Sequence, residues 1–131
     1  MRSIDFKLQN LKKVYIKLLD ACDRYDGIDE FIRDSVIQRF EFTYELCHKT
    51  LREFMKYMGA EPDNAFPRYI FKEAYSNGII DDEDVWLSMI EDRNRTSHVY
   101  SENMSDRIAE RIKNEYVYAI GKVIKNIEEN L

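Results

Sequence analysis

Glycine and proline are scarce in this chain, with 4 and 2 among its 131 residues. So few turn-forming residues predict few connections and therefore long elements, which are typical of helical proteins. The length suits one compact domain, expected to span residues 1–131. Hydrophobic residues make up 44% of the chain, which is too many for a disordered protein.

Cysteine is also rare, and its pattern does not predict a metal site. The chain has only Cys22 and Cys47, far apart in apolar stretches. His48 follows Cys47 directly, but adjacent helical residues point about 100° apart, so the pair is a poor chelate. We expect two buried free thiols in a reducing compartment, and neither a metal nor a cofactor.

The chain has no apolar run of about 18 residues and no excess of positive charge. We therefore expect no membrane-spanning segment, and residues 1–10 lack the apolar core of a signal peptide. Together these features predict a cytoplasmic protein. A net charge of −5 argues against a general nucleic-acid coat and against binding to anionic membranes, but it leaves room for a local positive site.

Apolar residues recur at steps of three and four through most of the chain, which predicts helices. The expected helices cover residues 3–22, 29–58, 68–76, 83–93 and 102–130. The predicted fold is all-α, an up-and-down four-helix bundle with one additional short helix. Phe6 and Phe31 are placed on the core-facing stripes. The second helix would be roughly 45 Å long, more than a small core needs, so we expect part of it to face a partner chain.

The stretch from Trp86 to Tyr100 carries the most chemistry. Its last eight residues hold Arg93, Asn94 and His98 as well as the tyrosine. On a straight helix Arg93 and His98 would point about 140° apart. Two arrangements would bring them together. The helix could end near Arg93, since Asn94 and the residues after it are weak helix formers. Alternatively, two copies could meet across a symmetric dimer.

An arginine and a histidine at this spacing suit chemistry at a phosphodiester. His98 can transfer a proton near neutral pH, and Arg93 can bind a phosphate through its guanidinium fork. Cleavage by these two groups needs no metal ion. An alternative is purely structural, with Arg93 and His98 capping the helix end and pairing with Glu91 or Asp92.

Two stretches of the chain resemble a known family. They are residues 33–46 (RDSVIQRFEFTYEL) and 86–100 (WLSMIEDRNRTSHVY). They are similar to the HEPN superfamily, and within it to the small helical nucleotidyltransferase substrate-binding proteins. The resemblance covers nearly the whole chain and implies a homodimer in which two copies of the Arg93–His98 motif face each other in a cleft.

The resemblance also implies a function. For members that are toxins, it implies metal-independent RNA cleavage by Arg93 and His98, with Asn94 as the polar residue of the motif. It implies a partner, a minimal nucleotidyltransferase (MNT), which can act as an antitoxin by adding AMP to Tyr100. The alternative within the family is a non-catalytic subunit that binds a nucleotide or other substrate for the nucleotidyltransferase. A structural helical adaptor, in which His98 is dispensable, is a third interpretation.

Positive charge must be concentrated if an acidic chain is to bind RNA, because phosphate contacts dominate affinity for nucleic acids. We therefore expect a local basic groove around Arg93, with Arg95 adding positive potential for RNA. The alternative for Arg95 is a solvated surface side chain.

The second predicted helix carries polar residues with simpler interpretations. Glu41 and Glu45 are four apart and share a face. We expect them to be solvated or to pair with Arg39 and Lys49. His48 is expected on the surface or in ordinary packing, with no role in function.

Overall fold

The computed structural model describes residues 1–131, and every element in it is helical. The elements are α1 (Ser3–Arg24), α2 (Glu30–Tyr57), α3 (Pro67–Ser76), α4 (Glu83–Arg95), α5 (Glu102–Arg111), a π-helical turn η1 (Ile112–Tyr116) and α6 (Val117–Glu129). The predicted all-α class is confirmed. The last predicted helix is continuous along the chain, but the π-helical turn divides it.

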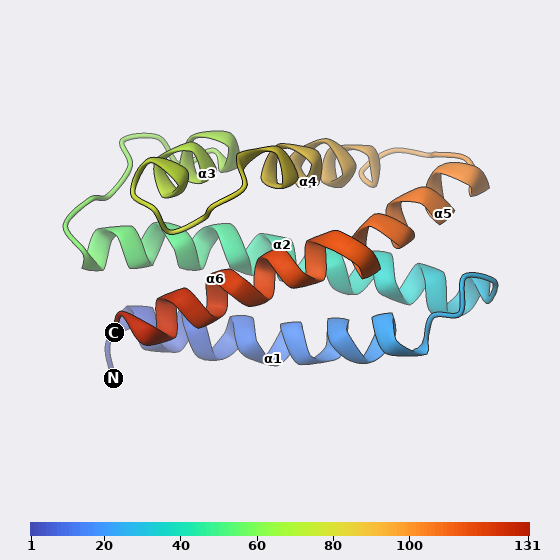
Figure 1. Cartoon of the computed structure of the whole chain (residues 1–131), viewed down its shortest axis with the longest axis horizontal. Coiled ribbons are helices and arrows are strands. Elements are labelled where there is room, and N and C mark those ends of the chain that lie inside the picture. The colour runs from blue at the N-terminus through green and yellow to red at the C-terminus, as the bar shows by residue number, and fades with distance from the viewer.

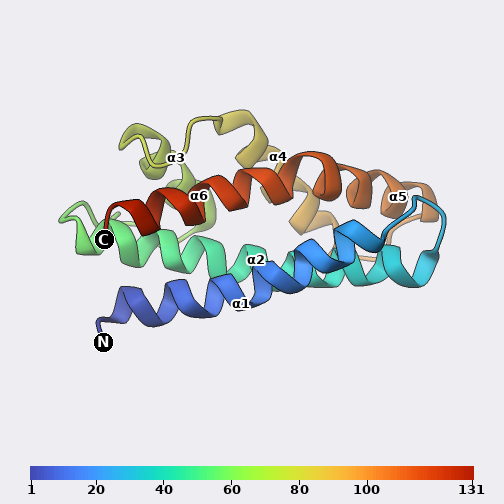
Figure 2. The same cartoon turned by 60° about the horizontal axis from the view of Figure 1, so that its bottom comes forward.

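The chain runs back and forth four times along one axis (Figure 1). The helices α1 and α2 form a hairpin, α3 and α4 together make the third pass, and α5, η1 and α6 make the fourth. The long α2 lies between α1 and the α3–α4 pair in both views (Figures 1 and 2). The predicted up-and-down bundle is therefore confirmed, with its third pass built from two short helices.

Local signals in the sequence set most helix ends. The Asp29 carboxylate accepts hydrogen bonds from the amides of the first turn of α2, and Asp82 and Ser101 cap α4 and α5 in the same way. Gly59 follows α2 with φ of 80°, a conformation that side chains rarely adopt. Pro67 opens α3, where a missing amide hydrogen costs nothing. These caps explain why the predicted boundaries agree with the structure to within a few residues.

The core runs the length of the bundle, and large side chains from every helix fill it. Its fully buried members include Phe40, Phe54, Phe71, Trp86 and Tyr116. Two of the residues predicted to be in the core are not there, because Phe6 is 55% exposed and Phe31 is 90% exposed.

The helical angle explains both errors. Phe6 is two residues from the buried Ile4 and Leu8, which is about 200° around the helix. Phe31 is five residues before the buried Val36, which places it about 140° away, in the first turn of α2.

The first and last helices make an unusually close contact. The Tyr15 hydroxyl of α1 donates to the Val117 carbonyl of α6 at 2.9 Å. Gly121 faces the same phenol so closely that a Cβ there would collide with the Tyr15 hydroxyl oxygen. A glycine is therefore required at this helix crossing. None of the helices is both long and apolar enough to cross a membrane.

Candidate functional site

The polar cluster predicted from the sequence lies where α4 ends. The helix stops at Arg95, Thr96 and Ser97 form a turn, and His98 follows in the connection to α5. Of the two arrangements expected for this motif, the structure has a helix end, two residues after Arg93. His98 is therefore not constrained to the helical angle that would hold it away from Arg93.

The guanidinium of Arg93 is held by α2 and by its own turn. Its Nη1 donates to Ser97 Oγ at 2.8 Å and to Thr96 Oγ1 at 3.4 Å. The same nitrogen lies 3.4 Å from Glu41 Oε2, and Nε lies 3.9 Å from Glu45 Oε1. No hydrogen bond is made by Nη2, and this nitrogen is not among the buried unpartnered atoms, so this edge of the fork is accessible to solvent.

These contacts correct two expectations. Glu41 and Glu45 pair with Arg93 rather than with Arg39 and Lys49. Arg39 instead donates to the Lys17 carbonyl at 2.7 Å. The structural alternative expected Glu91 or Asp92 as partners of the motif, but Arg93 reaches across to α2 instead.

Asp92, directly before Arg93, is the best-connected polar residue in the chain and was missed at the sequence level. Its side chain is 1% exposed. Arg111 donates to it through Nε at 2.8 Å and Nη2 at 2.9 Å, Arg95 donates through Nη1 at 2.8 Å, and the Tyr116 hydroxyl also donates to it. Burial alone would raise the pKa of Asp92, but these hydrogen bonds outweigh it and hold the pKa below its ordinary value.

The expected basic groove is not formed by Arg93 and Arg95. Arg93 is paired with Glu41 and Glu45, and Arg95 shares Asp92 with Arg111. Counted as formal charges, one guanidinium between two carboxylates leaves a net charge of −1 around Arg93. An anion would therefore reach this site through the open Nη2 edge rather than through a broad positive surface.

The other predicted site residues differ in their surroundings. Asn94 and His98 are exposed, and their side chains make no hydrogen bond or ion pair within the chain. Tyr100 is partly buried. Its pKa is raised by burial and by the negative charges of Glu41 and Asp34. Arg93 and Tyr100 thus both lie near enough to Glu41 to be influenced by its charge, whereas the side chain of His98 has no partner in the chain.

The remaining sequence predictions concern His48, the two cysteines and metal binding. His48 is packed, as predicted, with its ring edge-on to Tyr44 at 5.7 Å between centroids. Its Nε2 lies 3.3 Å from Glu45 Oε2. Cys22 and Cys47 are buried and unpaired, as predicted. No group of His, Cys, Asp and Glu residues could hold a metal ion.

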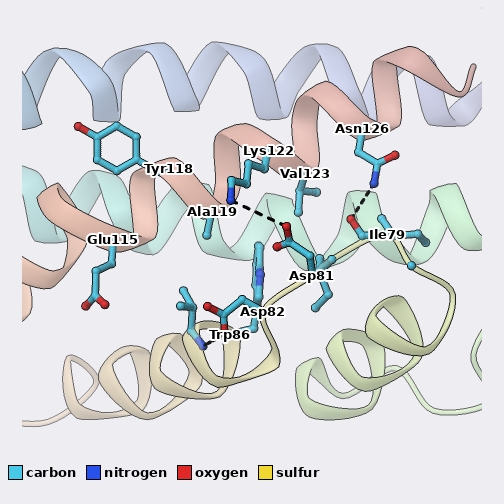
Figure 3. A pocket seen from close by; sticks show the side chains of 13 residues that line it. Ile79, Asp81, Asp82, Trp86, Glu115, Tyr118, Ala119, Lys122, Val123 and Asn126 are labelled. Carbon is cyan, nitrogen blue, oxygen red and sulfur yellow. Dashed lines mark hydrogen bonds and ion pairs between the residues drawn. The ribbon is translucent and has the colours of Figure 1, made fainter.

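A separate cavity of about 470 Å³ lies between the α3–α4 connection and the last pass of the chain (Figure 3). Trp86, Asp81, Glu115, Tyr118 and Lys122 are among its lining residues, and Lys122 Nζ lies 3.8 Å from Asp81 Oδ2. It contains neither Arg93 nor His98. This cavity is therefore distinct from the polar cluster at the end of α4.

Comparison with known proteins decides the family. The family described as nucleotidyltransferase substrate binding protein like matches residues 6–129. The chain belongs to this family. The match covers almost all of the domain, including both stretches that carry the resemblance and the whole polar cluster. The family match assigns no role to any individual residue.

Three similar proteins extend the comparison. A probable ribonuclease HepT of Haemophilus influenzae is 26% identical over 106 residues, which cover 76% of this chain and 72% of that protein. A crystal structure of a Thermus thermophilus protein has a TM-score of 0.80 and 26% identity, and covers 89% of this chain and 98% of its own. A tri-AMPylated Shewanella oneidensis HEPN toxin, solved in complex with an MNT antitoxin, has a TM-score of 0.74 and 19% identity, with 98% and 99% covered. The chain therefore has the fold of HEPN toxins.

Proposed function

We propose that this protein is a HEPN toxin-like endoribonuclease that works without a metal ion, with Arg93 and His98 as its reactive groups. The observation that carries the proposal is that the Arg93 guanidinium is held in place at the end of α4, while the imidazole of His98, five residues later, is exposed and has no partner in the chain. Arg93 is held on two sides and presents Nη2 to solvent, while His98 is exposed in the adjoining turn. The H. influenzae relative described as a probable ribonuclease supports the same activity.

In this proposal, RNA is cut by transesterification. A base removes the proton of the 2′-hydroxyl, the 2′-oxygen bonds to phosphorus, and the P–O5′ bond breaks as an acid protonates the leaving oxygen. Arg93 Nη2 stabilises the negative charge that develops on the phosphoryl oxygens. Asn94, on the last turn of α4, would orient the substrate through its amide.

This reaction needs both an acid and a base, and each chain has only one exposed histidine. A homodimer in which two His98 side chains face the same phosphate would supply both. The proposed active form is therefore a dimer whose cleft is built from two ends of α4. Such a dimer would bring two Arg93 side chains to the same cleft, each with its own Glu41 and Glu45.

An MNT partner that transfers AMP to Tyr100 would complete the proposed toxin–antitoxin pair. The phenol oxygen would attack the α-phosphorus of ATP, with loss of the phenol proton and release of pyrophosphate. The added phosphate would sit two residues from His98 and close to Glu41, where its negative charge would oppose the binding of RNA. The Shewanella toxin, which is AMPylated and bound to an MNT antitoxin, supports this regulation.

The second candidate is a non-catalytic subunit that binds a nucleotide or other substrate for a nucleotidyltransferase. The observation that favours it is the charge balance at Arg93, where two glutamates leave only one open nitrogen for an anion. The family description points the same way. One phosphate of a nucleotide would fit this open edge without any need for proton transfer by His98.

The deciding experiment is RNA cleavage in EDTA by the purified protein and by His98→Ala. Intact mass on each sample shows whether Tyr100 carries AMP. Because general acid–base groups contribute about 100-fold or more, the variant should lose at least that factor. Val99→Ala, which shortens an exposed side chain in the same turn, serves as the matched control and should cleave like the wild type.

Three outcomes would redirect the proposal. No cleavage by an unmodified, folded wild type would favour the substrate-binding subunit, and calorimetric titration with nucleotides would test that directly. Sedimentation that gives a monomer at micromolar concentration would remove the shared cleft. Equal cleavage by wild type and His98→Ala would exclude His98 as a reactive group.

A further inference from the structure

Two buried side-chain nitrogens in this protein have no hydrogen-bond partner, and both belong to side chains that contact the same residue. They are Nδ1 of His48 and Nε of Arg93. Unpartnered buried polar atoms are rare in folded proteins and are costly. Here both side chains contact Glu45, whose Oε2 faces His48 and whose Oε1 faces Arg93. The coincidence indicates that Glu45 is shared between two groups.

The contact with His48 fixes which nitrogen carries the proton. A carboxylate only accepts hydrogen bonds, so His48 Nε2 must be the donor to Glu45 at 3.3 Å. Nδ1 of the neutral ring is then a bare acceptor in a side chain that is about nine-tenths buried. A second proton there would have no acceptor. Burial accordingly lowers the pKa of His48, against the opposing effect of Glu45.

The contact between Arg93 and Glu45 is slightly too long to be a hydrogen bond. Arg93 Nε and Glu45 Oε1 are 3.9 Å apart, whereas such bonds are typically about 2.7–2.9 Å long. A movement of roughly 1 Å by the Glu45 carboxylate would therefore satisfy Nε–H. Because His48 holds the other oxygen, Oε2, that movement would also change the contact with the histidine. The arginine and the histidine are thus coupled through one carboxylate.

We propose that Glu45 is a positioning residue for Arg93 and that His48 acts through it. When Glu45 bonds Nε, the guanidinium is fixed by Nε on one side and by the Ser97 contact of Nη1 on another, and Nη2 points outward. In the present geometry Oε2 is held by His48 and Oε1 is 3.9 Å from Nε, so Arg93 keeps only its Nη1 contacts. This inference rests on the proposed function, because it assigns Arg93 the role of binding the phosphate.

The charged groups around His48 are few, which makes the coupling measurable. Glu45 and Lys49 act on it from α2, and Arg93 acts from α4 through Glu45. The chain has only two histidines, so the ring signals in an NMR titration belong to His48 and to the exposed His98. The titration of His48 therefore reports where the Glu45 carboxylate lies, and His98→Ala shows which of the two signals belongs to His48.

The first test is this titration in the wild type, Glu45→Gln and Arg93→Gln. We expect Glu45→Gln to lower the pKa of His48, since the neutral amide no longer favours the imidazolium. We expect Arg93→Gln to raise it by about half a pH unit or more, because Glu45 is released and a nearby positive charge is lost. Arg93→Lys, which keeps the charge without the Nε–H, separates the two causes. A His48 pKa that is unchanged in Arg93→Gln would overturn the coupling.

The second test is RNA cleavage by Glu45→Gln beside Glu53→Gln. Glu53 lies two turns further along α2 and makes no ion pair, so it is a matched control for charge and helix. We expect Glu45→Gln to lose about tenfold in kcat with little change in KM, and Glu53→Gln to behave as wild type. An increase in cleavage would show that Glu45 competes with the phosphate, which would overturn the positioning role. If the wild type does not cleave RNA, the proposed function fails, while the titration still decides this inference.

Discussion

The phenol of Tyr116 donates a hydrogen bond to the carboxylate of Asp92, the residue directly before Arg93. Tyr116 closes the π-helical turn in the last pass of the chain, and Asp92 lies in the last turn of α4. Arg111, directly before the same π-helical turn, donates to both oxygens of that carboxylate. The end of α4 is therefore held by Arg111 and Tyr116 of the last pass of the chain. The position of Arg93 depends on these contacts because Arg93 directly follows Asp92.

Replacing Asp92 with asparagine should destabilise the fold substantially. The change leaves the shape of the side chain nearly intact but removes the negative charge to which Arg95, Arg111 and Tyr116 donate hydrogen bonds. Breaking a fully buried ion pair costs about 3–5 kcal/mol, and both arginines are partly exposed, so we expect a loss of about 2–3 kcal/mol. Urea unfolding measures this directly. Glu91→Gln, the exposed neighbour, should change stability by less than about 0.5 kcal/mol.

Stability should fall as the pH drops below the ordinary pKa of histidine, because of His48. Its pKa in the folded protein lies below about 6.5, so the unfolded chain takes up this proton first. The stability from neutral His48 is therefore complete above about pH 6.5 and is lost as the pH falls towards the folded-state pKa. We expect the urea midpoint of the wild type to decrease more between about pH 7.5 and about pH 5.5 than that of His48→Gln. Equal decreases would contradict the buried neutral histidine.

Gly121→Ala should destabilise the protein, although alanine is normally the better helix former by about 1 kcal/mol. The new methyl group would collide with the Tyr15 hydroxyl at the crossing of α1 and α6. Overpacking of this kind costs about 1–3 kcal/mol, so the net loss should be about 1–2 kcal/mol. In a Tyr15→Phe background the nearest ring carbon is 3.2 Å from the new Cβ, and the loss should largely disappear. The measurement is thermal unfolding of the wild type, Gly121→Ala, Tyr15→Phe and the double variant. If the two side chains do not collide, the changes in unfolding free energy will be additive.

Both cysteines should be unreactive in the native protein. Burial raises the pKa of Cys47 to about 12 and that of Cys22 to about 11, so almost no thiolate forms near neutral pH. A chromogenic disulfide reagent should label neither thiol in the folded chain and both after unfolding in guanidinium chloride. Rapid labelling of one thiol in the native protein would show that its helix opens locally.

Local signals were enough to predict most of the fold. Asp29, Gly59, Pro67, Asp82 and Ser101 each act within a few residues of a helix end, and the structure uses all of them. Whether each apolar residue faced the core was harder to predict. Phe6 and Phe31 are as hydrophobic as their buried neighbours, and only their angle around the helix separates them from the core.

The site was predictable as a stretch but not as a set of contacts. Arg93, Asn94, His98 and Tyr100 stand together in the sequence, and their proposed roles remain predictions. The partners of the stretch lie far along the chain, since Arg111 and Tyr116 follow Asp92 by 19 and 24 positions. From the sequence, an aspartate next to Arg93 and Arg95 would be expected on the surface. It is buried only because the last pass of the chain packs against the end of α4.

The spacing of apolar residues in the last pass of the chain indicates the π-helical turn, although helical periodicity alone predicts a regular helix there. Buried residues recur at every fourth position through the last pass of the chain, at Ile108, Ile112, Tyr116, Ile120 and Ile124. On a regular α-helix each such step drifts by about 40°, so this series would wind away from the core. A wider turn absorbs part of the drift.

That turn also lets the last pass of the chain hold one residue more than a regular helix of the same rotation. The helix before it packs against α2, and the helix after it packs against α1. Deleting one residue from Ile112–Tyr116 would restore a regular helix that turns through nearly the same angle, so the apolar side of α6 would stay on the core. Deleting one residue within Val117–Glu129, where the helix is already regular, would instead rotate the residues that follow by about 100° and turn their apolar side away from the core. The π-helical turn is therefore a place where this helix can lose a residue without changing which of its sides faces the bundle.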